Sequence, residues 1–179
     1  MDTTPSDVVS FWRDAGPARW FRKDDTFDTA FRQRFEAAHD AAAAGSLAHW
    51  ADSAEGALAL LILLDQFPRN AFRDSPRMFA TDAQSVAIAD AAIHAGFDLA
   101  VDGPLRPFFY MPFMHSERLA DQQRCVTLAT PLGGGTLDYA RIHLEAIARF
   151  GRFPHRNALL GRATTPEEQH YLDTGGFKG

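Results

Sequence analysis

The fold is decided by residues 58–64, which read Leu-Ala-Leu-Leu-Ile-Leu-Leu. A helix formed by this stretch is apolar on every side, and such a helix belongs in the middle of a fold because none of its faces favours water. Ser46 or Ser53 can cap its N-terminus, and Pro68 is expected to end it. The dense apolar run covers only 57–64, well short of the roughly 20 residues that cross a bilayer. We therefore predict a buried helix and no membrane span.

Helix signals continue on the N-terminal side of this stretch, and strand signals are nearly absent. Residues 4–7 read Thr-Pro-Ser-Asp, which predicts a capped helix with proline in its first turn, and Gly16 ends that helix. A second helix begins near Asp24 or Asp25. The phenylalanines of residues 27–35 recur every four positions, so they lie on one face of this second helix.

The C-terminal side carries the same kind of signal. Further helix caps are expected at Thr81 or Asp82, Ser116, Thr136 and Thr165. Prolines between residues 104 and 112 break the chain into short pieces, and neither a composition break nor a low-complexity linker marks a second domain. We predict an all-α fold of seven to nine helices, packed as antiparallel hairpins in a single domain over residues 1–179.

The composition fits a folded protein, with 46% apolar and 23% charged residues among 179. A formal net charge of −5 argues against a general nucleic-acid binder, which normally presents a basic surface. The N-terminus shows no signal-peptide pattern, and the single cysteine, Cys125, can form no intrachain disulfide. We therefore expect a cytoplasmic protein without nucleic-acid or membrane partners, in which Cys125 is a buried, inert thiol.

Two related elements follow apolar helices. Residues 67–71 read Phe-Pro-Arg-Asn-Ala, and residues 153–158 read Phe-Pro-His-Arg-Asn-Ala. The match is short and one copy holds an extra residue, so chance is a fair explanation. A duplicated element is the other explanation, and it favours repeated helical hairpins.

Four longer runs carry a resemblance to a known family. They are Leu-Asp-Gln-Phe-Pro-Arg-Asn at 64–70, Phe-Ala-Thr-Asp at 79–82, Tyr-Met-Pro-Phe-Met-His-Ser-Glu at 110–117 and Arg-Phe-Gly-Arg-Phe-Pro-His-Arg-Asn at 149–157. With these runs the chain resembles, from Trp12 to Phe177, a bacterial family of uncharacterised proteins known as domain of unknown function 924. The resemblance implies an all-helical fold similar to tetratricopeptide-type hairpins. It implies no reaction and transfers no catalytic residue.

The first polar candidate is Asp65, which directly follows the apolar stretch. An acid at a helix C-terminus opposes the helix dipole and needs a partner when it is partly buried. Arg69 or Arg73 lies within reach if the chain turns at Pro68. Asp65 then either forms a structural ion pair, which is the simpler interpretation, or aims Arg69, with Asn70 beside it, into a pocket.

The densest polar cluster lies at residues 151–157, Gly-Arg-Phe-Pro-His-Arg-Asn. Arg152, His155 and Arg156 can each bind an anion, and Asn157 can donate and accept hydrogen bonds. The guanidinium fork matches two oxygens of a phosphate or carboxylate. The competing interpretation is structural, because arginines are favoured at helix C-termini.

Acid–base chemistry has its best candidates in His115, Glu117 and Asp121, with His143 as a further one. If Ser116 caps a helix, Glu117 and Asp121 lie four residues apart on one helix face and repel unless a cation or proton lies between them. The simpler interpretation is an acid favoured at a helix N-terminus. A metal site from these residues and His155 has only weak support, since no ligand motif is present. We predict neither a metal nor a cofactor.

Two functions remain from the sequence. In the first, Asp65, Arg69, Asn70, Arg152, His155, Arg156 and Asn157 line a cleft that binds a small anionic ligand. His115, Glu117 or His143 would supply acid–base chemistry there. In the second, the protein is a helical-repeat module that binds another protein, and its polar residues only hold turns together.

Overall fold

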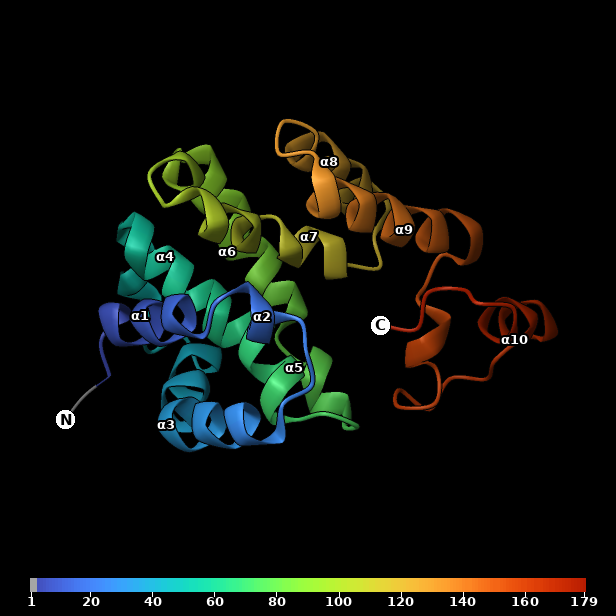
Figure 1. Ribbon diagram of the computed structural model, residues 1–179, viewed down its shortest axis with the longest axis horizontal. Coiled ribbons are helices and arrows are strands. Elements are labelled where there is room, and N and C mark those ends of the chain that lie inside the picture. Colours follow the sequence, from blue (N-terminus) through green and yellow to red (C-terminus); the bar gives the residue numbers. More distant parts are fainter. Residues whose placement is uncertain (1–2) are drawn as a thin grey trace. The chain divides into compact units, whose positions relative to one another are not determined.

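The computed structural model describes residues 3–179, and all regular secondary structure in that range is helical (Figure 1). The all-α prediction is confirmed. The described residues form ten α-helices rather than seven to nine, because short helices at Pro17–Trp20, Phe67–Ala71 and Met111–His115 were not expected. The chain divides into two compact units, Met1–Pro112 and Phe113–Gly179. The single-domain and tetratricopeptide-like descriptions stay predictions.

The first unit opens as the sequence predicts. Helix α1 (Pro5–Ala15) starts in a capping box, in which the Thr4 hydroxyl accepts from the Asp7 amide and the Asp7 carboxylate accepts from the Thr4 amide. Gly16 ends α1 with a φ of 69°, a conformation that favours glycine. After the short α2 (Pro17–Trp20), the Asp24 side chain caps α3 (Asp25–Ala43).

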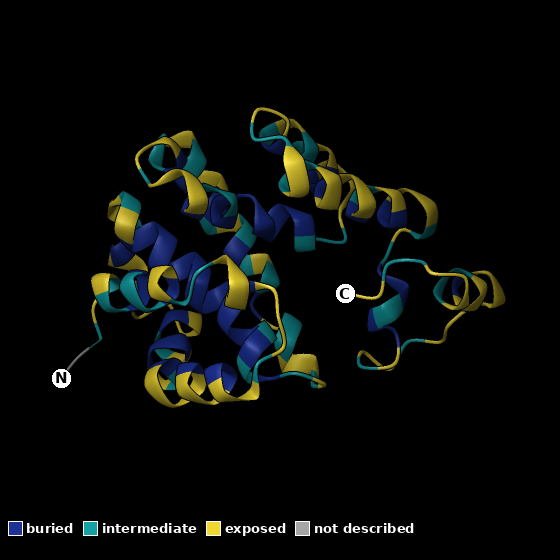
Figure 2. Ribbon diagram, viewed as in Figure 1, coloured by how far each residue is buried: buried dark blue, intermediate teal, exposed yellow. Residues whose placement is uncertain are grey.

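The helix formed by the apolar stretch lies at the centre of the first unit, but it does not end at Pro68 as predicted. Helix α4 (Ala54–Leu61), capped by Ser53, continues into a π-helical turn (Ile62–Gln66) and then α5 (Phe67–Ala71). The Phe67 amide bonds to the Ile62 carbonyl, five residues back, so the turn is widened. Pro68 then falls in a first helical turn, where its missing N–H is tolerated. Figure 2 shows most of this continuous helical segment, residues 56–68, as buried.

Packing around this centre explains the core. Helix α4 packs against α1 and α6 (Asp82–His94), and α3 packs against α5. The ring of Phe31 is fully buried and contacts Trp12 and Phe67 at centroid distances of 5.4 and 5.1 Å. The row of phenylalanines predicted on α3 is therefore core, as their spacing indicates.

Short helical pieces complete the first unit. They are 3-10 turns at Ala48–Asp52, Pro76–Phe79, Phe97–Leu99 and Gly103–Phe109, followed by α7 (Met111–His115), inside which the two units meet along the chain. Thr81 does precede α6, but its hydroxyl donates to the Leu64 carbonyl instead of capping the helix. The prolines of 104–112 break the chain into short pieces as predicted.

The second unit contains a hairpin and a separate short helix. Helices α8 (Leu119–Ala129) and α9 (Gly134–Phe150) pack against each other, and a 3-10 turn (Pro154–Arg156) precedes α10 (Pro166–Asp173). Thr165 caps α10 in the predicted capping box.

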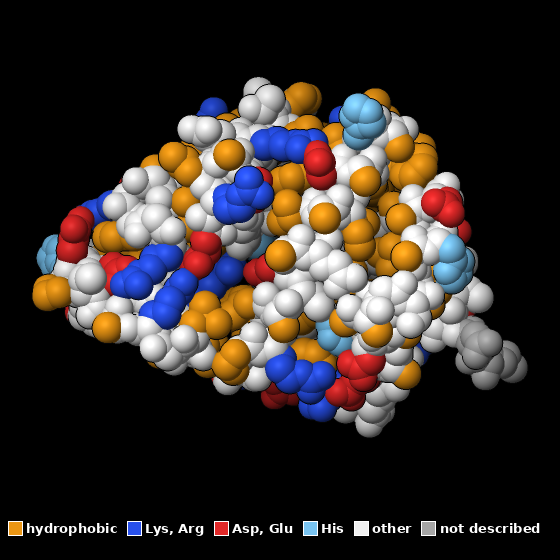
Figure 3. Space-filling view, turned by 180° about the vertical axis from the view of Figure 1, so that it is seen from behind, with side chains coloured by type: hydrophobic (Ala, Val, Ile, Leu, Met, Phe, Trp, Pro, Cys, Tyr) orange, Lys and Arg blue, Asp and Glu red, His pale blue; other side chains and the backbone are white. Residues whose placement is uncertain are grey.

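Two predicted caps are wrong. The N-cap of α8 is Arg118, because Ser116 lies outside the helix and its hydroxyl donates to Asp121 at 2.6 Å. The N-cap of α9 is Gly133, so Thr136 falls inside the first turn. In the part of the chain that the structure describes, no helix is long and apolar enough to cross a membrane. Figure 3 shows basic and acidic side chains next to one another on the displayed face.

Candidate functional site

In the first unit, the Phe-Pro-Arg-Asn element joins two acids. Asp65 is 1% exposed, and the Arg69 guanidinium lies 3.3 Å from its carboxylate. The same guanidinium forms a two-pronged ion pair with Asp82, at 2.9 and 3.0 Å. The ion pair that the sequence analysis offers as the simpler interpretation of Asp65 is present, and it holds α5 against α6.

Asn70 and Arg73 belong to a second polar group in the same unit. The Asn70 amide donates to the buried Asp28 carboxylate at 2.7 Å, and the Arg73 Nε donates to it at 2.7 Å. Arg73 therefore serves Asp28 of α3 instead of Asp65. These bonds tie α3 to α5. The prediction that Asp65, Arg69 and Asn70 line a ligand cleft stays a prediction.

In the second unit, Arg152 and Asn157 hold α10. The Arg152 guanidinium binds the Glu168 carboxylate through two bonds of 2.6 and 2.9 Å, and the Asn157 amide donates to the same carboxylate at 3.2 Å. The bond from Arg152, together with the capping box of Thr165, lowers the pKa of the Glu168 carboxyl to about 2. Arg152 is thus engaged in a structural ion pair.

Glu117 lies outside any helix, so the predicted pair of acids on one helix face is wrong. Its carboxylate accepts from the Phe153 amide at 2.8 Å and from the Arg162 guanidinium at 2.8 and 3.0 Å. Burial alone would raise the pKa of Glu117, but the bonds from Arg162 and Phe153 outweigh it and hold this pKa below its ordinary value. Asp121 lies on α8 and instead accepts from Ser116. Arg162, which the sequence analysis did not single out, anchors the turn.

Two imidazoles and a guanidinium gather around the buried Phe153 ring, and a third imidazole lies beside one of them. The rings of His143 and His155 lie 5.5 and 5.6 Å from the ring of Phe153, and the His115 ring lies 6.2 Å from His143. The Arg156 guanidinium stands 4.5 Å above Phe153 and donates to the His115 carbonyl at 3.0 Å. We call His115, His143, His155 and Arg156 the histidine cluster. Its members come from α7, α9 and the 3-10 turn before α10.

Two of these imidazoles are held neutral. Burial, followed by the neighbouring His115, lowers the pKa of His143 to about 3. Burial, followed by the charge of Arg156, lowers the pKa of His155 to about 4. The Nδ1 of His143 lies 2.7 Å from the Tyr139 carbonyl oxygen, which can only accept, so this nitrogen carries the proton and Nε2 carries the lone pair.

Residues 155–162, which begin within the cluster, hold buried polar atoms without hydrogen-bond partners. Within the described residues, the Nδ1 of His155, the Oδ1 of Asn157 and the Nε of Arg162 make no hydrogen bond although each atom is buried. Buried polar groups are normally satisfied, so such a concentration within residues 155–162 calls for an explanation. Between them these atoms offer a ligand both donors and an acceptor.

Comparison with known proteins places the chain in a family. The model of a bacterial family of unknown function, domain of unknown function 924, matches residues 8–176. The chain belongs to this family. A solved structure of a protein of unknown function from Agrobacterium tumefaciens is similar, with 53% identity, a TM-score of 0.94, and 96% of this chain and 97% of that chain covered. None of the curated proteins compared matches the chain.

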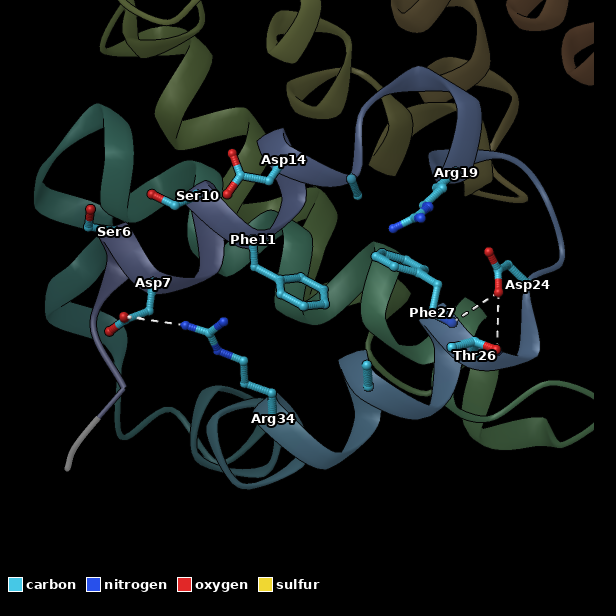
Figure 4. Close-up of a pocket in the computed structure, with 12 residues that line it drawn as sticks. Ser6, Asp7, Ser10, Phe11, Asp14, Arg19, Asp24, Thr26, Phe27 and Arg34 are labelled. Atoms are coloured by element: carbon cyan, nitrogen blue, oxygen red, sulfur yellow. Dashed lines mark hydrogen bonds and ion pairs between the residues drawn. The ribbon is translucent and has the colours of Figure 1, made fainter.

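A concave feature of this family member lies in the first unit. A groove of about 640 Å³ runs between α1 and α3, beside α2 (Figure 4). Phe11 lies in it and stacks on Phe27 at 5.4 Å, and Arg34 reaches across to Asp7 at 3.7 Å. Sequence reasoning missed this groove, because its lining combines residues from helix faces that each look like ordinary solvated surface.

Two further expectations concern a metal site and the reactivity of Cys125. No group of three or more His, Cys, Asp or Glu side chains in residues 3–179 is arranged to hold a metal ion. Cys125 is buried, as predicted, and burial raises the pKa of its thiol to about 12. A thiol with that pKa is a poor nucleophile near neutral pH.

Proposed function

We propose that this protein binds a small anion bearing a phosphate or carboxylate group at the histidine cluster. The observation that carries the proposal is a pair of buried nitrogens without a hydrogen-bond partner, the Nδ1 of His155 and the Nε of Arg162, in the segment that also supplies the Arg156 guanidinium over the Phe153 ring. An oxyanion accepts hydrogen bonds from arginine and imidazole donors and is favoured by their positive charge.

The electrostatics of the cluster support an anion over a cation or a neutral ligand. The charge of Arg156 contributes to the lowered pKa of both His143 and His155, so its field reaches both imidazoles. A bound anion opposes that field and raises both pKa values again. Binding is therefore coupled to proton uptake by an imidazole, and affinity increases as the pH falls.

The coupling of anion binding to proton uptake also indicates which residues carry out acid–base chemistry. Glu117 is held as a carboxylate by Arg162, so it is poorly suited to donate a proton. His143 and His155 are the groups that gain a proton when the anion binds and can pass it to the ligand. Of the candidates from the sequence, His143 with its Nε2 lone pair is thus favoured as the acid–base group, beside His115.

Calorimetric titration tests the proposal directly. Inorganic phosphate, sulfate and acetate are titrated into the protein in two buffers of different ionisation enthalpy, at about pH 5 and about pH 8. Sulfate is the decisive probe because it does not itself titrate in this range. We expect binding with net proton uptake and higher affinity at the lower pH.

A matched pair of variants locates the binding. Arg156→Lys keeps the charge but removes the two-pronged geometry, and we expect it to weaken binding by roughly tenfold. Arg141→Lys changes an exposed arginine of α9 in the same way and should have no effect. If no anion gives heat or a thermal shift with the wild-type protein, or if both variants behave alike, the proposal is wrong.

A second candidate function, binding of another protein, is favoured by the groove between α1 and α3. Its combination of the stacked Phe11 and Phe27 rings with charged walls suits a segment that has both apolar and charged side chains. A photoreactive residue in place of Ala30, which lines the groove, should cross-link the partner in cells. The same residue in place of the exposed Ala37, outside the groove, should not. Equal cross-linking from both positions would reject the groove as the site.

A further inference from the structure

The residues after α10 fold back in a defined way. Helix α10 ends at Asp173, and Gly175 then adopts a φ of 93°. The Gly176 amide donates to the Tyr171 carbonyl at 2.8 Å, and the Phe177 amide donates to the Tyr171 hydroxyl at 2.9 Å. The amides of Gly176 and Phe177 are therefore both held by one residue, Tyr171, while the Thr174 hydroxyl donates back to the His170 carbonyl at 2.8 Å.

The turn depends on a close approach that only glycine permits. A Cβ at position 176 would lie 2.5 Å from the Tyr171 carbonyl oxygen and 2.5 Å from a carbon of its ring. Such distances require the backbone to move, because real Cβ atoms do not approach other atoms so closely. The Gly175-Gly176 pair thus sets the direction in which Phe177 leaves the helix.

That direction brings the Phe177 ring onto the histidine cluster. The ring lies 4.1 Å from His143, 5.1 Å from His155 in an edge-on arrangement, and 6.0 Å from Phe153. The backbone of Gly179 also lies close to His155, because a Cβ there would be 3.3 Å from the imidazole. Two imidazoles that the proposed function uses are therefore covered by residues 177–179.

We propose that residues 174–179 form a strap that closes the histidine cluster and must lift before an anion can enter. The strap is suited to lifting because, beyond Thr174, which bonds back to His170, two amide bonds to Tyr171 and one partly buried ring hold it, while Lys178 and Gly179 stay exposed. Segments with so few buried contacts open at low free-energy cost. This inference rests on the proposed function for its purpose, but the closure itself can be measured without any ligand.

The ligand-free test uses the reactivity of the histidines. Diethyl pyrocarbonate acylates neutral imidazoles, and peptide mass spectrometry gives a separate rate for each histidine. In the wild-type protein we expect His143 and His155 to react far more slowly than the exposed His49 and His94. Phe177→Ala should raise the rates of the two covered imidazoles by about tenfold. Phe21→Ala, which removes a ring that is 68% exposed in the first unit, is the matched control and should leave them unchanged.

Unfolding is separated from strap opening by an internal standard. His39 is buried on α3 in the first unit, and the second-unit residue Cys125 is also buried. Their reactivity, His39 towards the same reagent and Cys125 towards a thiol reagent, should stay low in Phe177→Ala. If the reactivity of His39 or Cys125 rises, Phe177→Ala has disturbed the fold. Gly176→Ala, whose methyl group displaces the turn, is then the decisive variant. Unchanged rates at His143 and His155 in the decisive variant, or wild-type rates equal to those of His49, would overturn the strap.

Anion binding gives the second readout. Stopped-flow measurement with sulfate as the probe should show faster association with Phe177→Ala than with the wild type, because opening no longer limits entry. Slower or unchanged association would contradict the strap. If sulfate and phosphate bind neither protein while the imidazoles do become reactive, the strap stands and the proposed function fails.

Discussion

Glu168 joins the turn of the second unit to its last helix, and its removal makes a quantitative prediction. The side chain is buried and its carboxylate accepts from Arg152, from Asn157 and from the amide of Thr165. Glu168→Gln keeps the shape of the side chain but removes the charge. It should therefore weaken all three bonds at once and loosen α10 from the turn that carries His155 and Arg156.

The magnitude follows from the pKa of the carboxyl. Arg152 and the Thr165 cap lower the pKa from 4.5 to about 2. This difference corresponds to about 3.5 kcal/mol at ~1.4 kcal/mol per pKa unit. The Arg152 side chain is 29% exposed, and solvent screens its charge, so we expect about 2 kcal/mol of destabilisation near neutral pH.

The pH dependence has a definite sign. Because the pKa of Glu168 is lower in the folded than in the unfolded protein, its stabilisation is complete above 4.5 and is lost as the pH falls towards about 2. The difference between wild type and Glu168→Gln should shrink over the same range, since protonated glutamate resembles glutamine.

The assay must report on the second unit. The three tryptophans, at positions 12, 20 and 50, all lie in the first unit, so tryptophan fluorescence does not follow α10. Urea unfolding by circular dichroism, with hydrogen exchange of residues 152–173 read by mass spectrometry, supplies the measurement. Glu167→Gln is the control, because Glu167 forms an exposed pair with Arg149 that is worth at most ~1 kcal/mol. Equal effects of both variants, or a difference for Glu168→Gln that stays constant down to about pH 3, would refute this account.

Three further predictions concern the core. Gly56→Ala should destabilise the first unit by about 1–3 kcal/mol, because its Cβ would lie 2.0 Å from the Trp50 carbonyl oxygen. This effect opposes the usual preference of helices for alanine. Fluorescence-monitored urea unfolding measures the loss of stability. Phe31→Ala should cost about 3–5 kcal/mol in the same assay, since the ring is fully buried, whereas the exposed Phe21→Ala should change stability by less than about 0.5 kcal/mol. Cys125 should resist a thiol reagent at about pH 8 in the folded protein and react fully in urea, and rapid reaction of the native thiol would contradict its burial.

Local signals in the sequence predicted the elements whose cause is itself local. Thr4, Ser53 and Thr165 cap helices because a side-chain oxygen reaches an amide three residues ahead, and both partners are visible in sequence. The predicted end of the central helix at Pro68 was wrong because the cause of the continued helix is not a local residue signal. A π-turn is formed by a hydrogen bond from a backbone amide to the carbonyl five residues earlier, here from Phe67 to Ile62. No residue type in 62–66 is typical of such a turn.

The candidate site was predictable only in part. The polar residues at 152–157 drew attention to this turn because they lie close together in the sequence. The partners of that turn are distant in sequence: Glu117 meets Arg162 across 45 residues, and His143 reaches Phe153 from the middle of α9. Phe177 gave no signal beyond the Gly-Gly pair before it, since an isolated aromatic near a polar cluster is more often ordinary core.

The two Phe-Pro elements show why similar sequences need not share a role. In the first element, Arg69 forms ion pairs with Asp65 and Asp82, and these ion pairs fix the position of α5. In the second, the extra His155 carries a buried ring nitrogen without a hydrogen-bond partner. A structural arginine is still required, and Arg152, which comes before the element, fills that role. Arg156 stacks on Phe153 beside the imidazoles. The chemistry of the second element therefore arises from two changes in its surroundings, an inserted histidine and a preceding arginine that takes over the structural ion pair.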